Sequence, residues 1–161
     1  MTTIIRHTIL VSALTTLTAC AAEQNAQPVS LRSIHQSAHC GSELPGVRWL
    51  SHEDLTGLLN SAGAGQHWNA APVVPAPVAD DEKWVMVSLG QKNSGGYSVA
   101  LANAQADVRG QVVHLPLDIQ RPAPDSMQTM QMTTPCIVIG LRGENYQTVS
   151  AESLGSVTVD K

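Results

Sequence analysis

The sequence contains no phenylalanine, and its aromatic residues are limited to three tryptophans and two tyrosines. A core without phenylalanine must be built mainly from valine, isoleucine, leucine, methionine and alanine. Because β-branched side chains favour strands, this composition argues against an all-helical fold. Acidic residues outnumber basic ones by 13 to 9, and the formal charge of −4 argues against nucleic-acid binding.

The motifs of the common catalytic sites are also missing. The sequence has no Gly-x-Ser-x-Gly elbow, no His-Glu-x-x-His zinc motif and no phosphate-binding loop. We interpret the run Asp80-Asp81-Glu82 as solvated charges rather than as an acid/base pair. The protein is therefore not expected to be an enzyme, and we expect no catalytic residues, no cofactor and no metal.

No apolar run reaches the roughly 20 residues that a membrane-spanning helix needs. The first 19 residues instead have the form of a secretory signal, with Arg6 ahead of a short uncharged segment. This segment ends in Leu17-Thr18-Ala19-Cys20, which resembles the lipobox of bacterial lipoproteins. The alternative is ordinary secretion with cleavage near the same place.

We therefore expect residues 1–19 to be a signal peptide, Cys20 to carry a lipid, and residues 20–28 to form a lipidated tether. Several acyl chains on one cysteine anchor a protein stably without a protein helix. Ala21, where inner-membrane lipoproteins commonly have aspartate, favours sorting to the outer membrane, facing the periplasm. The expected location is the cell envelope.

Besides Cys20, the chain has only Cys40 and Cys136. An even pair of cysteines in an exported protein indicates a disulfide. The alternative is a thiolate metal or redox site, for which His35 and His39 beside Cys40 are the best additional ligands. Structural zinc sites have four ligands, and His35, His39 and Cys40 supply only three. The disulfide is therefore the preferred interpretation.

Residues 29–161 are expected to form a single α+β domain. It should be mostly antiparallel β, with one short N-terminal helix at about residues 51–61. Ser51 is the expected N-cap, and Glu53 and Asp54 lie in the first turn, where negative charge suits the helix dipole. The proline-rich stretch 61–83, which includes His67 and Trp68, should run extended.

Strands are expected at 29–33, 47–50, 84–89, 97–101, 113–119, 136–141, 146–149 and 156–159. The two strands 84–89 and 97–101 should form a hairpin through Asn93-Ser94-Gly95-Gly96. Pro116, within the run 113–119, marks an edge strand or a bulge. The continuous apolar run 136–141 is typical of a central strand.

The segment Leu89-Gly90-Gln91-Lys92-Asn93-Ser94-Gly95-Gly96-Tyr97-Ser98-Val99, with prolines at 122, 124 and 135, resembles the PrcB-like family (the PrcB C-terminal domain type). Threonine is usual in that family where Ser94 stands here. The resemblance covers residues 80–142, the PrcB-like core. The founding member of the family is a lipoprotein subunit of a surface protease complex. The resemblance implies a non-catalytic subunit that associates with a protease or stabilises it.

We therefore expect an accessory lipoprotein that binds an envelope protein, with a protease as the candidate partner. Its candidate partner-binding loop comprises Lys92, Ser94, Gly95, Gly96 and Tyr97, although a purely architectural role for Gly95-Gly96-Tyr97 in a tight hairpin is the favoured interpretation. An edge strand at Pro116 and the proline-rich loop offer further binding surface. The alternative is a lipoprotein that binds a small ligand or an envelope polymer; a metal-binding protein ranks lower.

Overall fold

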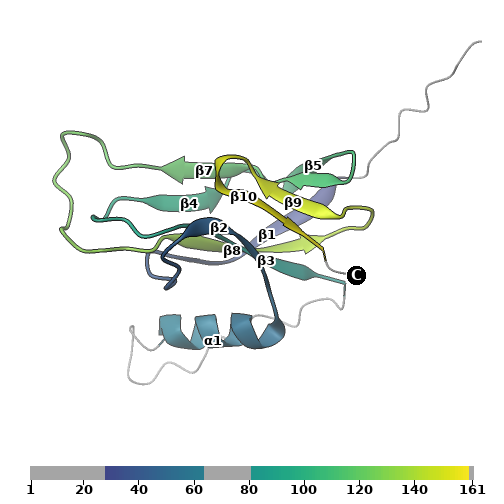
Figure 1. The fold of residues 1–161 in the computed structure, drawn as a ribbon, viewed down its shortest axis with the longest axis horizontal. Helices are drawn as coiled ribbons and strands as arrows, with labels where there is room; N and C mark the ends of the chain where they lie inside the picture. Colours follow the sequence, from purple (N-terminus) through teal and green to yellow (C-terminus); the bar gives the residue numbers. More distant parts are fainter. Residues whose placement is uncertain (1–27, 64–80, 160–161) are drawn as a thin grey trace, which may run out of the picture.

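The computed structural model describes residues 28–63 and 81–159 (Figure 1). Within these residues the elements are β1 (Val29–Ser37), β2 (Pro45–Leu50), α1 (His52–Gly63), β3 (Lys83–Leu89), β4 (Ser98–Leu101), β5 (Gln105–Arg109), β6 (Val112–His114), β7 (Leu117–Gln120), β8 (Cys136–Arg142), β9 (Thr148–Ala151), the 3-10 helix η1 (Glu152–Leu154) and β10 (Gly155–Thr158). No helix in this part of the chain is both long enough and apolar enough to cross a membrane.

Eight of the strands form one sheet in the order β10-β9-β6-β5-β1-β8-β3-β2. Neighbours are antiparallel, except that β6 and β9 run parallel. The two end strands, β2 and β10, contact each other. There Trp49 donates a hydrogen bond from its indole Nε1 to the backbone oxygen of Thr158 at 2.8 Å. The sheet is therefore a nearly closed barrel whose seam is bridged by a side chain.

The α+β class expected from the sequence is wrong, because strands dominate the described residues and form this barrel-like sheet. α1, which is the one α-helix of the described residues, lies against the outside of the barrel (Figure 1). The sequence was misread because the helix has strong local signals, whereas closure of a sheet depends on contacts between distant segments. The described residues form a mostly β, barrel-like fold.

β8 lies at the centre of the fold, between β1 and β3. Successive side chains of a strand point to opposite faces, and β8 buries both. Ile137, Ile139 and Leu141 face the main core inside the barrel. Cys136 and Val138 face a second cluster, which Leu55 of α1 covers. This confirms the prediction of a central strand and explains why its apolar run is continuous.

The start of α1 is capped as predicted. The backbone N–H of Asp54 donates to Ser51 Oγ at 3.1 Å, and the backbone N–H of Ser51 donates to Asp54 Oδ2 at 3.1 Å. The Ser51 hydroxyl also donates to Asp54 Oδ2 at 2.7 Å. These hydrogen bonds from Ser51 lower the pKa of Asp54. The two residues thus form a reciprocal capping box, with aspartate in the place of the usual glutamate.

The predicted hairpin between 84–89 and 97–101 does not form. β3 pairs with β2 and β8, whereas β4 pairs with β7 in a separate two-stranded ribbon. The predicted strand 113–119 is also two strands, β6 and β7, with a break at Leu115 and Pro116. Proline cannot donate a ladder hydrogen bond, and the chain changes partners at this point.

The structure joins Cys40 and Cys136, the pair expected from the sequence, by a disulfide with a Cα–Cα distance of 6.0 Å. It ties the segment after β1 to the first residue of the central strand. The sequence separation is 96 residues. Cross-linking so long a loop removes much of the conformational freedom of the unfolded chain.

We predict that replacing both cysteines by alanine lowers the free energy of unfolding by about 2–5 kcal/mol, measured by urea denaturation. Reductant should shift the unfolding midpoint of the wild-type protein and leave that of the double variant unchanged. Equal midpoints for oxidised wild-type protein and the double variant would contradict a stabilising disulfide.

Candidate partner-binding surface

The predicted partner-binding loop lies against a second loop of the same chain. We call residues 91–97 the motif loop and residues 121–134 the methionine loop. Their backbones are joined at Lys92 and Thr133, each of which donates its N–H to the other's oxygen, at 2.8 and 2.9 Å. Gly95 N–H donates to the oxygen of Thr129 at 3.0 Å, and Thr133 Oγ1 donates to the oxygen of Ser94 at 3.0 Å. The motif loop therefore supports the methionine loop.

The two glycines of the motif permit this close contact. Gly96 has φ +82°, a conformation that L side chains rarely adopt. A Cβ at Gly96 would collide with the side chain of Gln128, and one at Gly95 would lie 2.5 Å from Thr129 Oγ1. Tyr97 packs its ring against the main core, with Lys92 Nζ 5.7 Å from the ring centre. These contacts give the Gly-Gly-Tyr motif an architectural role; contact with a partner stays a prediction.

Among the described residues, the exposed large apolar side chains are three methionines of the methionine loop and Leu44, which precedes β2. Their exposed fractions are 102% for Met127, 94% for Met130, 63% for Met132 and 78% for Leu44. Gln91 links the two parts, because its backbone N–H donates to the oxygen of Glu43 at 2.8 Å and its Nε2 lies 2.8 Å from Met132 Sδ. We call these four residues the methionine surface.

Clustered exposed apolar side chains mark interaction sites more often than isolated ones do. Methionine is unbranched and polarizable, so it adapts to irregular partner surfaces. The sequence interpretation missed this surface. The available signal was the spacing of Met127, Met130 and Met132, three large apolar residues in a segment with no strand or helix periodicity.

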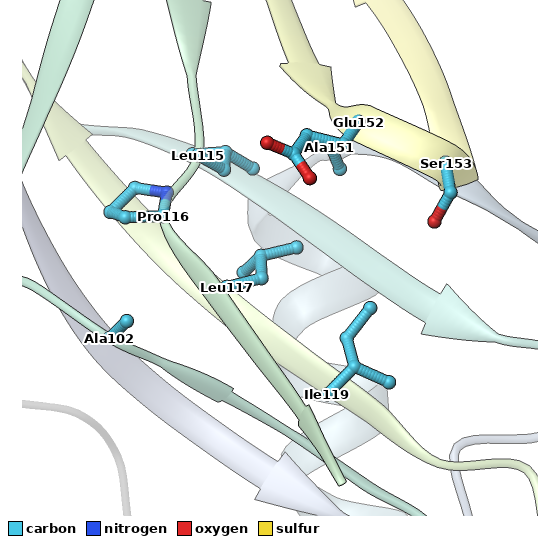
Figure 2. A pocket seen from close by; sticks show the side chains of 8 residues that line it. All are labelled: Ala102, Leu115, Pro116, Leu117, Ile119, Ala151, Glu152 and Ser153. Atoms are coloured by element: carbon cyan, nitrogen blue, oxygen red, sulfur yellow. The ribbon is translucent and has the colours of Figure 1, made fainter. Parts of the chain in front are cut away.

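A small pocket opens at the break between β6 and β7 (Figure 2). Its volume is about 220 Å³. Its lining is apolar apart from Glu152 and Ser153, and the other residues are Ala102, Leu115, Pro116, Leu117, Ile119 and Ala151. Figure 2 shows the side chains of Leu117 and Ile119 pointing from β7 toward the segment that follows β9. Pro116, which the sequence analysis placed at a strand edge or bulge, thus lines this pocket.

Glu82 is not a solvated charge, which corrects the sequence interpretation for this residue; Asp81 is exposed as expected, and Asp80 lies outside the described residues. The Glu82 side chain is 3% exposed, and it accepts hydrogen bonds from Arg32 Nε at 2.6 Å and Arg32 Nη2 at 2.8 Å. Gly140 on β8 makes room for this carboxylate, because a Cβ there would collide with it. A bidentate pair of this kind fixes the position of both side chains. Glu82 therefore has a structural partner.

The three residues considered as metal ligands, His35, His39 and Cys40, each have a different structural environment. Cys40 is in the disulfide, and His39 forms a bridge with Thr134 through the backbone. His35 is half-buried in β1, where burial lowers the pKa of its imidazole. Within residues 28–63 and 81–159, no group of three or more His, Cys, Asp or Glu side chains is placed to hold a metal ion.

Several predicted features lie outside the described residues. They are the signal peptide 1–19, the lipidation site Cys20, most of the tether 20–28, and the proline-rich stretch around His67 and Trp68. The predicted partner-binding loop lies within the described residues. Its residues Lys92, Ser94, Gly95 and Gly96 contact the methionine loop.

Residues 84–142 match the family model described as PrcB C-terminal. This segment is similar to the PrcB C-terminal domain. It runs from β3 to β8 and contains the motif loop, the methionine loop and one wall of the pocket. β1, β2 and α1 precede the matched segment, and β9, η1 and β10 follow it. Neither the curated proteins nor the solved structures contain a match to this chain.

We predict that Gly96→Ala destabilises the PrcB-like domain more than Gly110→Ala. Both glycines have positive φ, +82° and +63°, so both variants carry a backbone penalty of about 1–2 kcal/mol. Only a Cβ at Gly96 meets neighbouring atoms; at Gly110 there is nothing within 4 Å. Overpacking should add about 1–3 kcal/mol at Gly96. Urea denaturation of the two variants checks this, and equal losses would show that the loops are not in contact.

Proposed function

We propose that the protein is a non-catalytic accessory subunit that binds a protease complex in the bacterial cell envelope. The observation that carries the proposal is the methionine surface, because the PrcB-like motif itself holds most of that surface in place. Gly95 and Gly96 leave room for the methionine loop to pack against the motif loop, and the methionine side chains of that loop are exposed to solvent. The motif and the exposed surface therefore form one structural unit.

The apolar character of the surface suits binding rather than chemistry. Protein interfaces are enriched in methionine and aromatic residues near their centres, where charged residues are depleted. Met127 and Met130 are almost fully in water, and both would gain burial on association. Lys92 and Gln91 border the surface and supply polar groups for its rim.

The placement of the surface also suits a lipid-anchored subunit. β1 begins at the right of Figure 1, and the methionine loop lies at the left, at opposite ends of the longest axis. The proposed anchor at Cys20 precedes β1. A domain tethered through the start of β1 would hold the methionine surface away from the membrane, toward a partner in the periplasm.

We predict that replacing Met127, Met130 and Met132 together by glutamine abolishes binding to the partner. Cross-linking in cells, purification and quantitative mass spectrometry would identify what the wild-type protein binds, and the expected enriched protein is an envelope peptidase. Recovery of that peptidase should fall about tenfold or more in the triple variant, since central apolar contacts each contribute about 1 kcal/mol or more. These side chains are already exposed, so the unfolding free energy should change little.

Gln131→Ala is the matched control, because Gln131 is exposed in the same loop and is not apolar. It should leave recovery of the peptidase unchanged. Two outcomes would contradict the proposal: a wild-type protein that enriches no peptidase, or a triple variant that recovers the same peptidase at the wild-type level.

A further inference from the structure

The chain leaves the barrel sheet between β6 and β7, because β6 belongs to the eight-stranded sheet and β7 to the two-stranded ribbon. Up to this point β6 pairs with β9 in a parallel ladder that ends at His114 and Ser150, and Leu115 N–H donates to the oxygen of Ser150 at 2.9 Å. β9 ends at Ala151, and the chain turns away through η1. β7 therefore continues past the end of the strand that flanked β6.

The hydrogen-bond pattern shows which backbone groups of β7 point away from β4. Ala102 N–H donates to the oxygen of Pro116 at 2.8 Å, so this pair is hydrogen-bonded. Directly opposed residues of an antiparallel pair alternate between bonded and non-bonded. Asp118, opposite Ala100, and Gln120, opposite Ser98, are then bonded as well.

It follows that Leu117 and Ile119 direct their N–H and C=O groups away from β4, toward the side that β9 occupies beside β6. Among the described residues, neither has a backbone hydrogen-bond partner on that side. An edge with unpaired main-chain groups is a template for another strand. β7 thus carries a short free edge on the two-stranded ribbon beside the nearly closed barrel sheet.

The pocket lies beside this edge, and the side chains of Leu117 and Ile119 line it. Its volume of about 220 Å³ is below the roughly 300–1,000 Å³ of small-molecule sites. It is therefore sized for an amino-acid side chain rather than for a free ligand of drug size. Strand-adding peptides use main-chain hydrogen bonds for affinity and side-chain pockets for selectivity.

Glu152 defines the chemistry of the rim. Among the described residues that line the pocket it alone is charged, and Figure 2 shows its carboxylate turned toward Leu115. Its backbone has φ +25°, an uncommon conformation for a residue with a side chain. A carboxylate beside an apolar hollow complements a basic group beside an apolar one.

We propose that the free edge of β7 binds an extended peptide segment of a partner protein as an added strand. An aliphatic side chain of the segment fills the pocket, and a lysine or arginine of the segment lies against Glu152. This site goes beyond the proposed function, because it is formed by β7, β9 and η1 and does not use the methionine surface.

A display library of random short peptides, selected on the full-length protein and counter-selected on an Ile119→Pro variant, tests the site. Proline at 119 removes one of the two outward N–H groups without breaking a bond to β4. Selected peptides should contain aliphatic residues near a lysine or arginine. They should shift the NMR amide signals of Leu117 and Ile119 when titrated into the protein.

Glu152→Gln should weaken binding of the selected peptides by up to about 5-fold, as expected for a partly exposed ion pair. Glu144→Gln is the matched control, because Glu144 is exposed and does not line the pocket, and it should have no effect. Failure to select any peptide that depends on Ile119, or shifts confined to the methionine loop, would overturn this site. The first result would not bear on binding through the methionine surface, and the second would assign peptide binding to that surface instead.

Discussion

The burial of β8 on both faces is the constraint on which the rest of the structure depends. Its odd-numbered apolar side chains, Ile137, Ile139 and Leu141, close the barrel core, and Cys136 and Val138 support the helix. Because water cannot reach the backbone of a strand buried in this way, its N–H and C=O groups need hydrogen-bond partners on both edges. β1 and β3 supply these partners. The disulfide at Cys136 and the space that Gly140 leaves for Glu82 belong to the same arrangement.

The surfaces assigned to binding lie where this arrangement is least complete. Opposite β8, the ladder between β6 and β9 ends at Ser150, and β7 leaves the barrel sheet to pair with β4 alone. Beyond β7, the methionine loop is held by the motif loop and, at its last residue Thr134, by hydrogen bonds to backbone groups of residues 38–41. The central claim is therefore that the described residues present two binding surfaces to partners: the free edge of β7 and the exposed apolar methionine surface.

Local signals predicted some of this and could not predict the rest. The continuous apolar run identified β8, and Ser51 with Asp54 identified the start of α1, because both depend on neighbouring residues. Gly95 and Gly96 suggested a hairpin, yet their small size serves contact with Gln128 and Thr129, which are distant in sequence. Barrel closure, the burial of Glu82 and the exposure of Met127 likewise arise from long-range packing, which periodicity and turn signals do not encode.

Amide hydrogen exchange along β7, resolved by NMR in the free protein, tests the central claim most directly. The account predicts alternation: the amides of Asp118 and Gln120, bonded to β4, exchange slowly, whereas those of Leu117 and Ile119 exchange fast. The amides of β8 should be the slowest, exchanging only through global unfolding. Slow exchange at Leu117 and Ile119, equal to that of their neighbours, would show that the edge is already paired and would contradict the account.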